Sequence, residues 1–156
     1  MKLLGLVVKR DEVRAGFISV AEHCEDFGSR ALQRIKGSYT LTLTPYEIGN
    51  ALWKEATLLK RVTLGESTYI LSTVMQLLKF IHVVEPGNVE LTLNIAYKLR
   101  ITYYDASYIV VAYELNASLV TDDYKLRRRV EEGSRDLQEV LGGKVALLTS
   151  NEIIQS

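Results

Sequence analysis

Cysteine is almost absent from this chain of 156 residues, in which Cys24 is the only one. A single thiol cannot form an internal disulfide. The neighbouring His23 has no second Cys or His pair with which to build a structural zinc site. This cysteine usage suits a reducing compartment, and we expect a cytoplasmic protein.

The sequence also lacks a net charge and any long hydrophobic run. Nineteen basic residues balance nineteen acidic ones at a pI near 6.7, so nucleic acid could be bound only by a local patch. No apolar run approaches the roughly 20 residues that cross a bilayer, and we expect a soluble protein. The apolar hexad Leu3 to Val8 precedes charged residues and no small-residue cleavage site, which predicts a strand rather than a secretory signal.

Hydrophobic residues make up 47% of the chain, enough to bury the core of one globular domain spanning residues 1–156. Their spacing predicts strands alternating with helices. The predicted strands are Leu3–Val8, Ser38–Thr44, Phe80–Val84, Ala117–Thr121 and Lys144–Thr149. The predicted helices are Val20–Lys36, Thr44–Lys60, Gly65–Lys79, Asn88–Leu99, Asp105–Leu115 and Asp123–Glu132. This alternation favours an α/β fold, a three-layer α/β/α sandwich around a central parallel sheet of four or five strands.

Acidic residues occur where predicted strands end or helices begin. Glu47 follows the strand ending at Thr44, and Asp122 and Asp123 follow the strand ending at Thr121. Asp105 begins the helix that leads back into that last strand. Since ligands of parallel sheets collect beyond the carboxyl ends of the strands, we expect these acids to converge.

Converging carboxylates repel one another unless a cation compensates them. Mg²⁺ or Mn²⁺ prefers carboxylate oxygens, and either ion can generate a hydroxide and stabilise a phosphoryl group under attack. The acids therefore suggest phosphodiester hydrolysis without a protein nucleophile.

Each acid also has a purely structural interpretation. In "TPYE", Thr44 is a natural helix N-cap, Pro45 suits the first turn, and Glu47 has the capping-box spacing. Asp105 could likewise cap its helix, and either Asp122 or Asp123 could cap the next one.

Two stretches, "LTLTPYEIGNAL" and "YYDASYIVVAYELNASLVTDDYKL", carry a family resemblance. With the order of strands and helices, they resemble the PIN domain of VapC-like ribonuclease toxins from about Ala21 to Thr149. Glu47, Asp105 and Asp123 match the second, third and fourth acids of that family. The resemblance implies a metal-dependent endoribonuclease that binds Mg²⁺ or Mn²⁺, acts on RNA, is inhibited by an antitoxin protein, and forms a homodimer.

This chain differs from the family at the position of the first acid. Asp11 precedes Glu47 by about the usual interval and is a metal-ligand candidate by spacing only, because charged residues surround it in "KRDEVRAG". A second register aligns "GFISV" with the first strand and puts Ser19 in that place. The alternative function is therefore a catalytically impaired PIN-like module that binds RNA or protein.

Supporting roles fall to residues near the acids and on one helix. Asn50, Thr121 and Asp122 could orient the carboxylates, and Lys125, Arg127 and Arg128 could contact RNA phosphates.

The remaining apolar and aromatic side chains are expected to pack. We expect most tyrosines, including Tyr104, Tyr108 and Tyr113, to pack in the core. The predicted helix Gly65–Lys79 carries an apolar stripe wider than one sheet face needs, which favours burial against a second subunit or an antitoxin helix. Its members are Tyr69, Ile70, Leu71, Val74, Met75, Leu77 and Leu78.

Overall fold

A computed structural model describes residues 6–9, 37–150 and 152 of the chain. The predicted helix Val20–Lys36 and the candidate positions Asp11 and Ser19 lie outside these residues.

Short strands pair in the order β3-β2-β1-β4-β5. They are β1 (Leu6–Lys9), β2 (Tyr39–Leu41), β3 (His82–Val84), β4 (Ala117–Val120) and β5 (Ala146–Leu148). β2 is parallel to β3 and β4 is parallel to β5, whereas β1 runs antiparallel to both β2 and β4. The α/β class is thus as predicted, but the wholly parallel sheet is wrong at β1. A run of apolar residues has the same pattern in either direction, so periodicity predicts this strand without predicting which way it runs.

The reversal of β1 matters for the position of the site. Lys9, its last residue, pairs with Ala117, the first residue of β4, while Leu6 pairs with Val120. The chain therefore leaves β1 at the edge opposite to the carboxyl ends of β2, β3, β4 and β5, which all point the same way.

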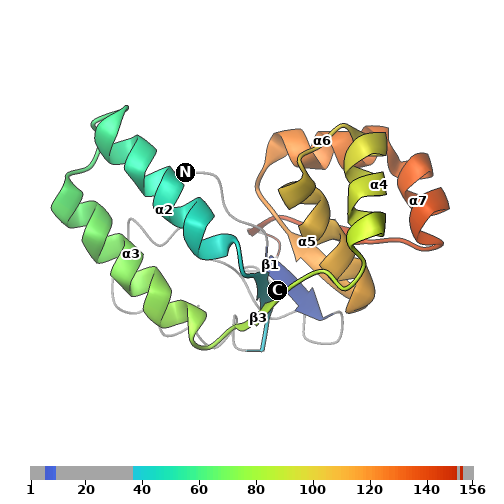
Figure 1. The fold of residues 1–156 in the computed structure, drawn as a ribbon, viewed down its shortest axis with the longest axis horizontal. Helices are drawn as coiled ribbons and strands as arrows, with labels where there is room; N and C mark the ends of the chain where they lie inside the picture. Colours follow the sequence, from blue (N-terminus) through green and yellow to red (C-terminus); the bar gives the residue numbers. More distant parts are fainter. Residues whose placement is uncertain (1–5, 10–36, 151, 153–156) are drawn as a thin grey trace.

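The helices follow the predicted boundaries within a few residues. They are α2 (Thr44–Thr57), α3 (Leu64–Leu78), α4 (Val89–Leu99), α5 (Tyr103–Glu114), α6 (Tyr124–Glu132) and α7 (Ser134–Leu141). α7 was not predicted, because this short helix buries only Leu137 and Leu141, one turn apart. α2 and α3 form an antiparallel hairpin on one side of the molecule, and α4 to α7 gather on the other (Figure 1).

Two hydrophobic clusters bind these helices to the strands. α4 to α7 and Leu119 of β4 share one cluster, whereas α2, α3 and Val120 of β4 share the other. Neighbouring strand residues point to opposite faces, so β4 packs against both groups of helices. α5 is buried from Ala106 to Ala112, which fixes the middle of this helix in the core.

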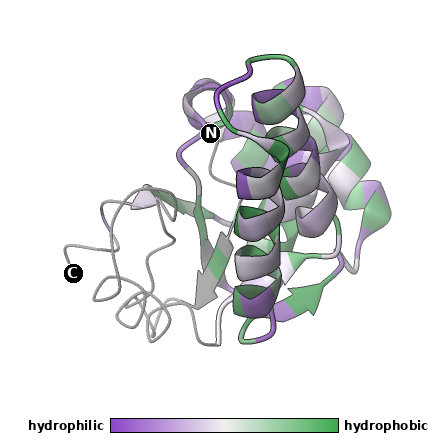
Figure 2. Ribbon diagram, turned by 90° about the vertical axis from the view of Figure 1, so that its left-hand side faces the viewer, coloured by the Kyte–Doolittle hydropathy of each residue, from purple (hydrophilic) through white to green (hydrophobic). Residues whose placement is uncertain are grey.

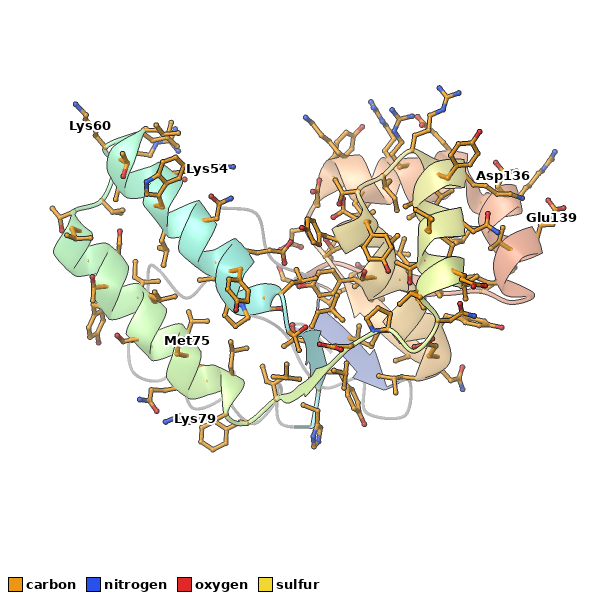
Figure 3. All side chains as sticks on the ribbon, viewed as in Figure 1. Lys54, Lys60, Met75, Lys79, Asp136 and Glu139 are labelled. Atoms are coloured by element: carbon orange, nitrogen blue, oxygen red, sulfur yellow. The ribbon has the colours of Figure 1, made fainter. Side chains whose placement is uncertain are left out.

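The apolar stripe of α3 is largely covered by its own chain. Val74 and Leu78 are buried, and Ile70, Leu71, Met75 and Leu77 pack partly against the α2–α3 cluster. Met75 lies on the side of α3 that faces α2 (Figure 3). Tyr69, at 74% exposure, is the member of the stripe that remains outside the cluster. In the part of the chain that the structure describes, no helix combines the length and the apolarity that a bilayer crossing needs.

Candidate active site

The carboxyl ends of β2 and β4 lead directly to predicted site residues. β2 ends at Leu41, three residues before α2 begins at Thr44, and Glu47 lies in the first turn of that helix. β4 ends at Val120, and Asp123 caps the helix that follows. Asp105 lies in the first turn of α5, the helix that returns to β4.

Glu47 does not belong to the predicted capping box. The N-cap of α2 is Leu43, and its side chain makes no capping hydrogen bond. Thr44 is buried and places its Oγ1 2.7 Å from Oγ1 of Thr40 and 2.8 Å from the hydroxyl of Tyr108. The hydroxyl of Tyr108 in turn donates to Oε2 of Glu47 at 2.9 Å. Pro45 at the helix start favours this outcome, because its ring fixes the backbone without any cap from Thr44.

Tyr108 is therefore a site residue that the sequence analysis assigned only to packing. Its ring is buried at 3% exposure, yet its hydroxyl reaches the half-buried carboxylate of Glu47. Burial raises the pKa of the Tyr108 hydroxyl, and the negative charge of Glu47 raises it further, so this group remains a donor. The signal in the sequence was its position three residues after Asp105, which places both residues on one face of α5.

Asp105 is held by the residue that caps its helix. Thr102 is the N-cap of α5, and its Oγ1 accepts a hydrogen bond from the backbone N–H of Asp105 at 3.0 Å. The same hydroxyl donates to Oδ2 of Asp105 at 2.7 Å. Asp105 is thus not the cap, and its carboxylate is oriented by one.

Glu47 and Asp105 influence each other electrostatically. Burial is the main reason why the pKa of the Glu47 carboxyl lies above its ordinary value of 4.5, and the negative charge of Asp105 adds to the rise. The hydrogen bond from Tyr108 acts in the opposite direction and favours the charged form. Two carboxylates with this mutual repulsion are a natural place for a cation.

Asp123 is the N-cap of α6, as its structural interpretation predicted. Its Oδ1 accepts from the backbone N–H of Lys125 at 2.9 Å and of Leu126 at 3.4 Å. Thr121 is buried, and its Oγ1 accepts from the N–H of Asp123 at 3.1 Å, so Thr121 does orient this residue. Asp122 is engaged elsewhere, because its Oδ1 accepts from the N–H of Ser150 beyond β5.

A groove of about 760 Å³ opens beside Glu47. Asn50, one turn further along α2, lines it with Glu47, as do Glu85 after β3 and two tyrosines, Tyr46 and Tyr104. Tyr46 is 80% exposed and Tyr104 is 60% exposed. The packing predicted for Tyr104 is therefore wrong, because the first turn of α5 projects beyond the core that buries the rest of that helix.

The donor set suits a hard divalent cation only in part. Carboxylate oxygens of Glu47 and Asp105 are what Mg²⁺ or Mn²⁺ prefers, and Mg²⁺ commonly uses one or two carboxylates with water and substrate phosphates completing its shell. Among residues 6–9, 37–150 and 152, however, no three or more His, Cys, Asp or Glu side chains are grouped to hold a metal ion. That Asp123 joins the other two acids stays a prediction.

Two of the three basic residues beside the site have structural partners. Arg127 donates from Nη1 to the carbonyl of Thr121 at 3.4 Å, and Arg128 forms an ion pair with Glu132 at 3.5 Å. Lys125 is exposed on the first turn of α6. Arg127 therefore helps to fix the strand end that precedes Asp123.

The fold and these residues define an α/β protein with an acidic site at the carboxyl edge of its strands. No protein-family model matches the sequence. The chain is 39% identical over 101 residues to a protein named exonuclease VapC9 from Pyrobaculum aerophilum. The match covers 65% of this chain and 72% of that protein. The chain belongs to the VapC family.

Proposed function

We propose that this protein is a metal-dependent ribonuclease, the toxin of a toxin–antitoxin pair, and that Glu47 and Asp105 bind the ion. The observation that carries the proposal is the half-buried carboxylate of Glu47, which is repelled by Asp105, held by Tyr108, and placed on the wall of an open groove. The family relationship supports the same function, since its curated relative is named as a nuclease.

The chemistry follows from the charges. A bound Mg²⁺ or Mn²⁺ would supply a nucleophilic hydroxide at neutral pH and offset the charge of the phosphoryl group. Glu47 and Asp105 would hold the ion, with Asp123 as a third ligand. Tyr108 and Thr102 would keep the first two carboxylates in place through the hydrogen bonds that they already make.

We further propose that the cut falls inside the RNA strand. The groove is open rather than closed around a strand end, so an internal segment can lie along it. The name of the relative indicates removal of terminal nucleotides instead, and a circular single-stranded RNA distinguishes the two modes because it has no ends. An endonuclease converts the circle to a linear product, whereas an exonuclease leaves it intact.

The test of function uses that circle with Mn²⁺, with Mg²⁺ and with EDTA. Cutting should require either ion, and Asp105→Asn should abolish it while leaving the fold unchanged. Asp136→Asn is the matched control, since Asp136 also lies in the first turn of a helix but on α7, at the far side of the molecule (Figure 3). Equal loss of activity in both variants would mean that folding, not the site, was damaged.

One observation favours a second candidate, a PIN-like module that binds RNA or a protein without cutting. β1 leaves the sheet at the edge away from Glu47 and Asp105, so the described strands do not provide the first acid that the family resemblance implies. RNA binding without cleavage by either ion, on linear and circular substrates alike, would establish this candidate.

Partners follow from the same proposal. An antitoxin protein would inhibit the nuclease in the cytoplasm, and a homodimer would form through the outer end of the α2–α3 hairpin. Large apolar side chains are exposed there, including Leu58 at 61%, Leu64 at 78% and Tyr69 at 74%. Lys125 and Arg128, both exposed on α6, would contact RNA phosphates.

A further inference from the structure

We infer that the groove beside Glu47 is a subsite for one unpaired RNA base, held between the rings of Tyr46 and Tyr104. The inference rests on the proposed function and names the part of the substrate that this groove takes. Both rings line the groove, one from α2 and one from α5.

Each ring directly precedes a site acid in the sequence. Tyr46 precedes Glu47 and Tyr104 precedes Asp105, both in the first turns of their helices. Neighbouring residues of a helix point about 100° apart, because 3.6 residues make one turn. The two acids can therefore interact with each other while the two tyrosines flank them.

The high exposure of these two rings indicates that a ligand covers them. Tyr46 is 80% and Tyr104 is 60% exposed, although aromatic rings contribute strongly when buried. Buried Tyr108, on the same helix as Tyr104, shows that this region has a core available for such a ring. Two large rings left open on one groove, next to the proposed reacting groups, fit a flat aromatic partner.

The charge of the groove decides which part of RNA enters it. Among the residues that the structure describes, its lining contains the carboxylates of Glu47 and Glu85 and no basic side chain. A phosphate inside the groove would be repelled, whereas an uncharged base can stack on the rings and hydrogen-bond to Asn50 or Thr42. The phosphate then stays outside the groove. In a duplex the bases are already stacked and paired, so the subsite selects single-stranded RNA.

The test measures base stacking without cleavage. The probe is a short single-stranded oligoribonucleotide with one 2-aminopurine among uridines, mixed with the full chain in EDTA. Stacking on the rings should quench the 2-aminopurine fluorescence, and the same strand in a duplex should bind far more weakly.

Substitutions identify the rings. Tyr46→Ala and Tyr104→Ala should each weaken binding roughly tenfold or more, the usual loss for one stacking ring, while Tyr46→Phe and Tyr104→Phe keep the quenching. Tyr97→Ala is the matched control, since Tyr97 is 84% exposed on α4 and does not line the groove. It should bind like the wild type.

Two results would overturn the inference. They are wild-type quenching in both alanine variants, and loss of binding in the phenylalanine variants as well as in the alanine variants. Cleavage of circular RNA is measured separately with Mn²⁺. Stacking without cleavage would contradict the proposed nuclease activity and leave the base subsite supported. Cleavage that both alanine variants retain at the full rate would contradict the subsite alone.

Discussion

The hydroxyl of Tyr108 donates a hydrogen bond to Oε2 of Glu47 across 2.9 Å, and this bond joins α5 to α2 through two residues that are 61 positions apart in the sequence. The same hydroxyl lies 2.8 Å from Oγ1 of Thr44, which lies 2.7 Å from Oγ1 of Thr40. A chain of buried hydroxyls thus links β2, α2 and α5 and ends at a carboxylate on the groove. Such a chain fixes one oxygen of Glu47 and leaves the other for a cation.

The first prediction concerns Tyr108→Phe, which removes this donor and keeps the ring. Glu47 loses the one interaction that lowers its pKa, so its pKa should rise further and the acid limb of the pH–rate profile should move to higher pH. We expect an activity loss of about tenfold, as for other residues that orient metal ligands. The free energy of unfolding should fall by about 1 kcal/mol.

The matched control for this variant is Tyr113→Phe on the same helix. Tyr113 is half-buried, and the structure assigns it no contact with either acid. An unchanged pH profile in Tyr108→Phe, or an equal shift in Tyr113→Phe, would contradict the positioning role of the Tyr108 hydroxyl.

The second prediction concerns the stability of the metal-free protein with Glu47→Gln. Because the pKa of Glu47 is raised in the fold, the folded state binds this proton more tightly than the unfolded state does. The wild type therefore loses stability as the pH rises from about the ordinary value of 4.5 through the folded pKa. Glutamine has no such proton, so the variant should melt at a higher temperature than the wild type at pH 7.

The difference should disappear below the ordinary pKa, where Glu47 is protonated in both states. Thermal melts of both proteins across this pH range, with EDTA present, provide the measurement. Glu85→Gln is the control, since Glu85 lines the same groove and its Oε1 accepts from Thr42. A wild type that is more stable than Glu47→Gln at pH 7 would show that the carboxylate is not under the repulsion described here.

Much of the fold could be predicted because it depends on local patterns. Continuous apolar runs mark β4, which is buried at all four residues, and α5, which is buried from Ala106 to Ala112. The direction of β1 could not be predicted, since it depends on pairing with residues as far as 114 positions away in the chain, as for Leu6 and its partner Val120. Long-range pairing leaves little trace in a short apolar run.

The site was predictable in its acids and not in its hydrogen bonds. Thr44 and Glu47 have the spacing of a capping box in the sequence. In the structure, however, both side chains form hydrogen bonds with the hydroxyl of Tyr108, which is distant in the chain. The structure has a capping box instead at Thr63 and Glu66, where no such competitor reaches the helix start. The local spacing predicts a cap, but tertiary contacts determine whether the cap forms.

The third prediction separates the two roles of Asp123. Asparagine caps helices about as well as aspartate, so Asp123→Asn should keep the bonds to Lys125 and Leu126 and melt within about 2 °C of the wild type without metal. If Asp123 is a metal ligand, Mn²⁺ should raise the melting temperature of the wild type and do so far less in Asp123→Asn.

The comparison variant is Asp123→Ala, which loses the cap as well and should cost about 1 kcal/mol without metal. An equal Mn²⁺ effect in the wild type and Asp123→Asn would assign Asp123 to capping alone. Glu47 and Asp105 would then be the acids left to hold the ion among the described residues.

The fourth prediction concerns the homodimer proposed at the end of the α2–α3 hairpin. This side of the molecule carries both hydrophobic and hydrophilic residues on its helices (Figure 2), and Lys54 and Lys60 lie near the outer end of the hairpin (Figure 3). Leu64 is the first residue of α3 and is 78% exposed, so burying its side chain in a dimer would stabilise the dimer. Leu64→Glu puts a charge in that contact, yet an acid in the first turn of a helix favours the fold of the monomer. We expect the dissociation constant of the dimer to rise by about tenfold or more, measured as mass against concentration by light scattering.

The control is Leu93→Glu on α4. Leu93 is another exposed leucine, at 62% exposure, and its substitution should leave the dimer intact. A wild type that is monomeric at micromolar concentration would contradict the homodimer, and dimers that persist in Leu64→Glu would place the contact elsewhere on the surface.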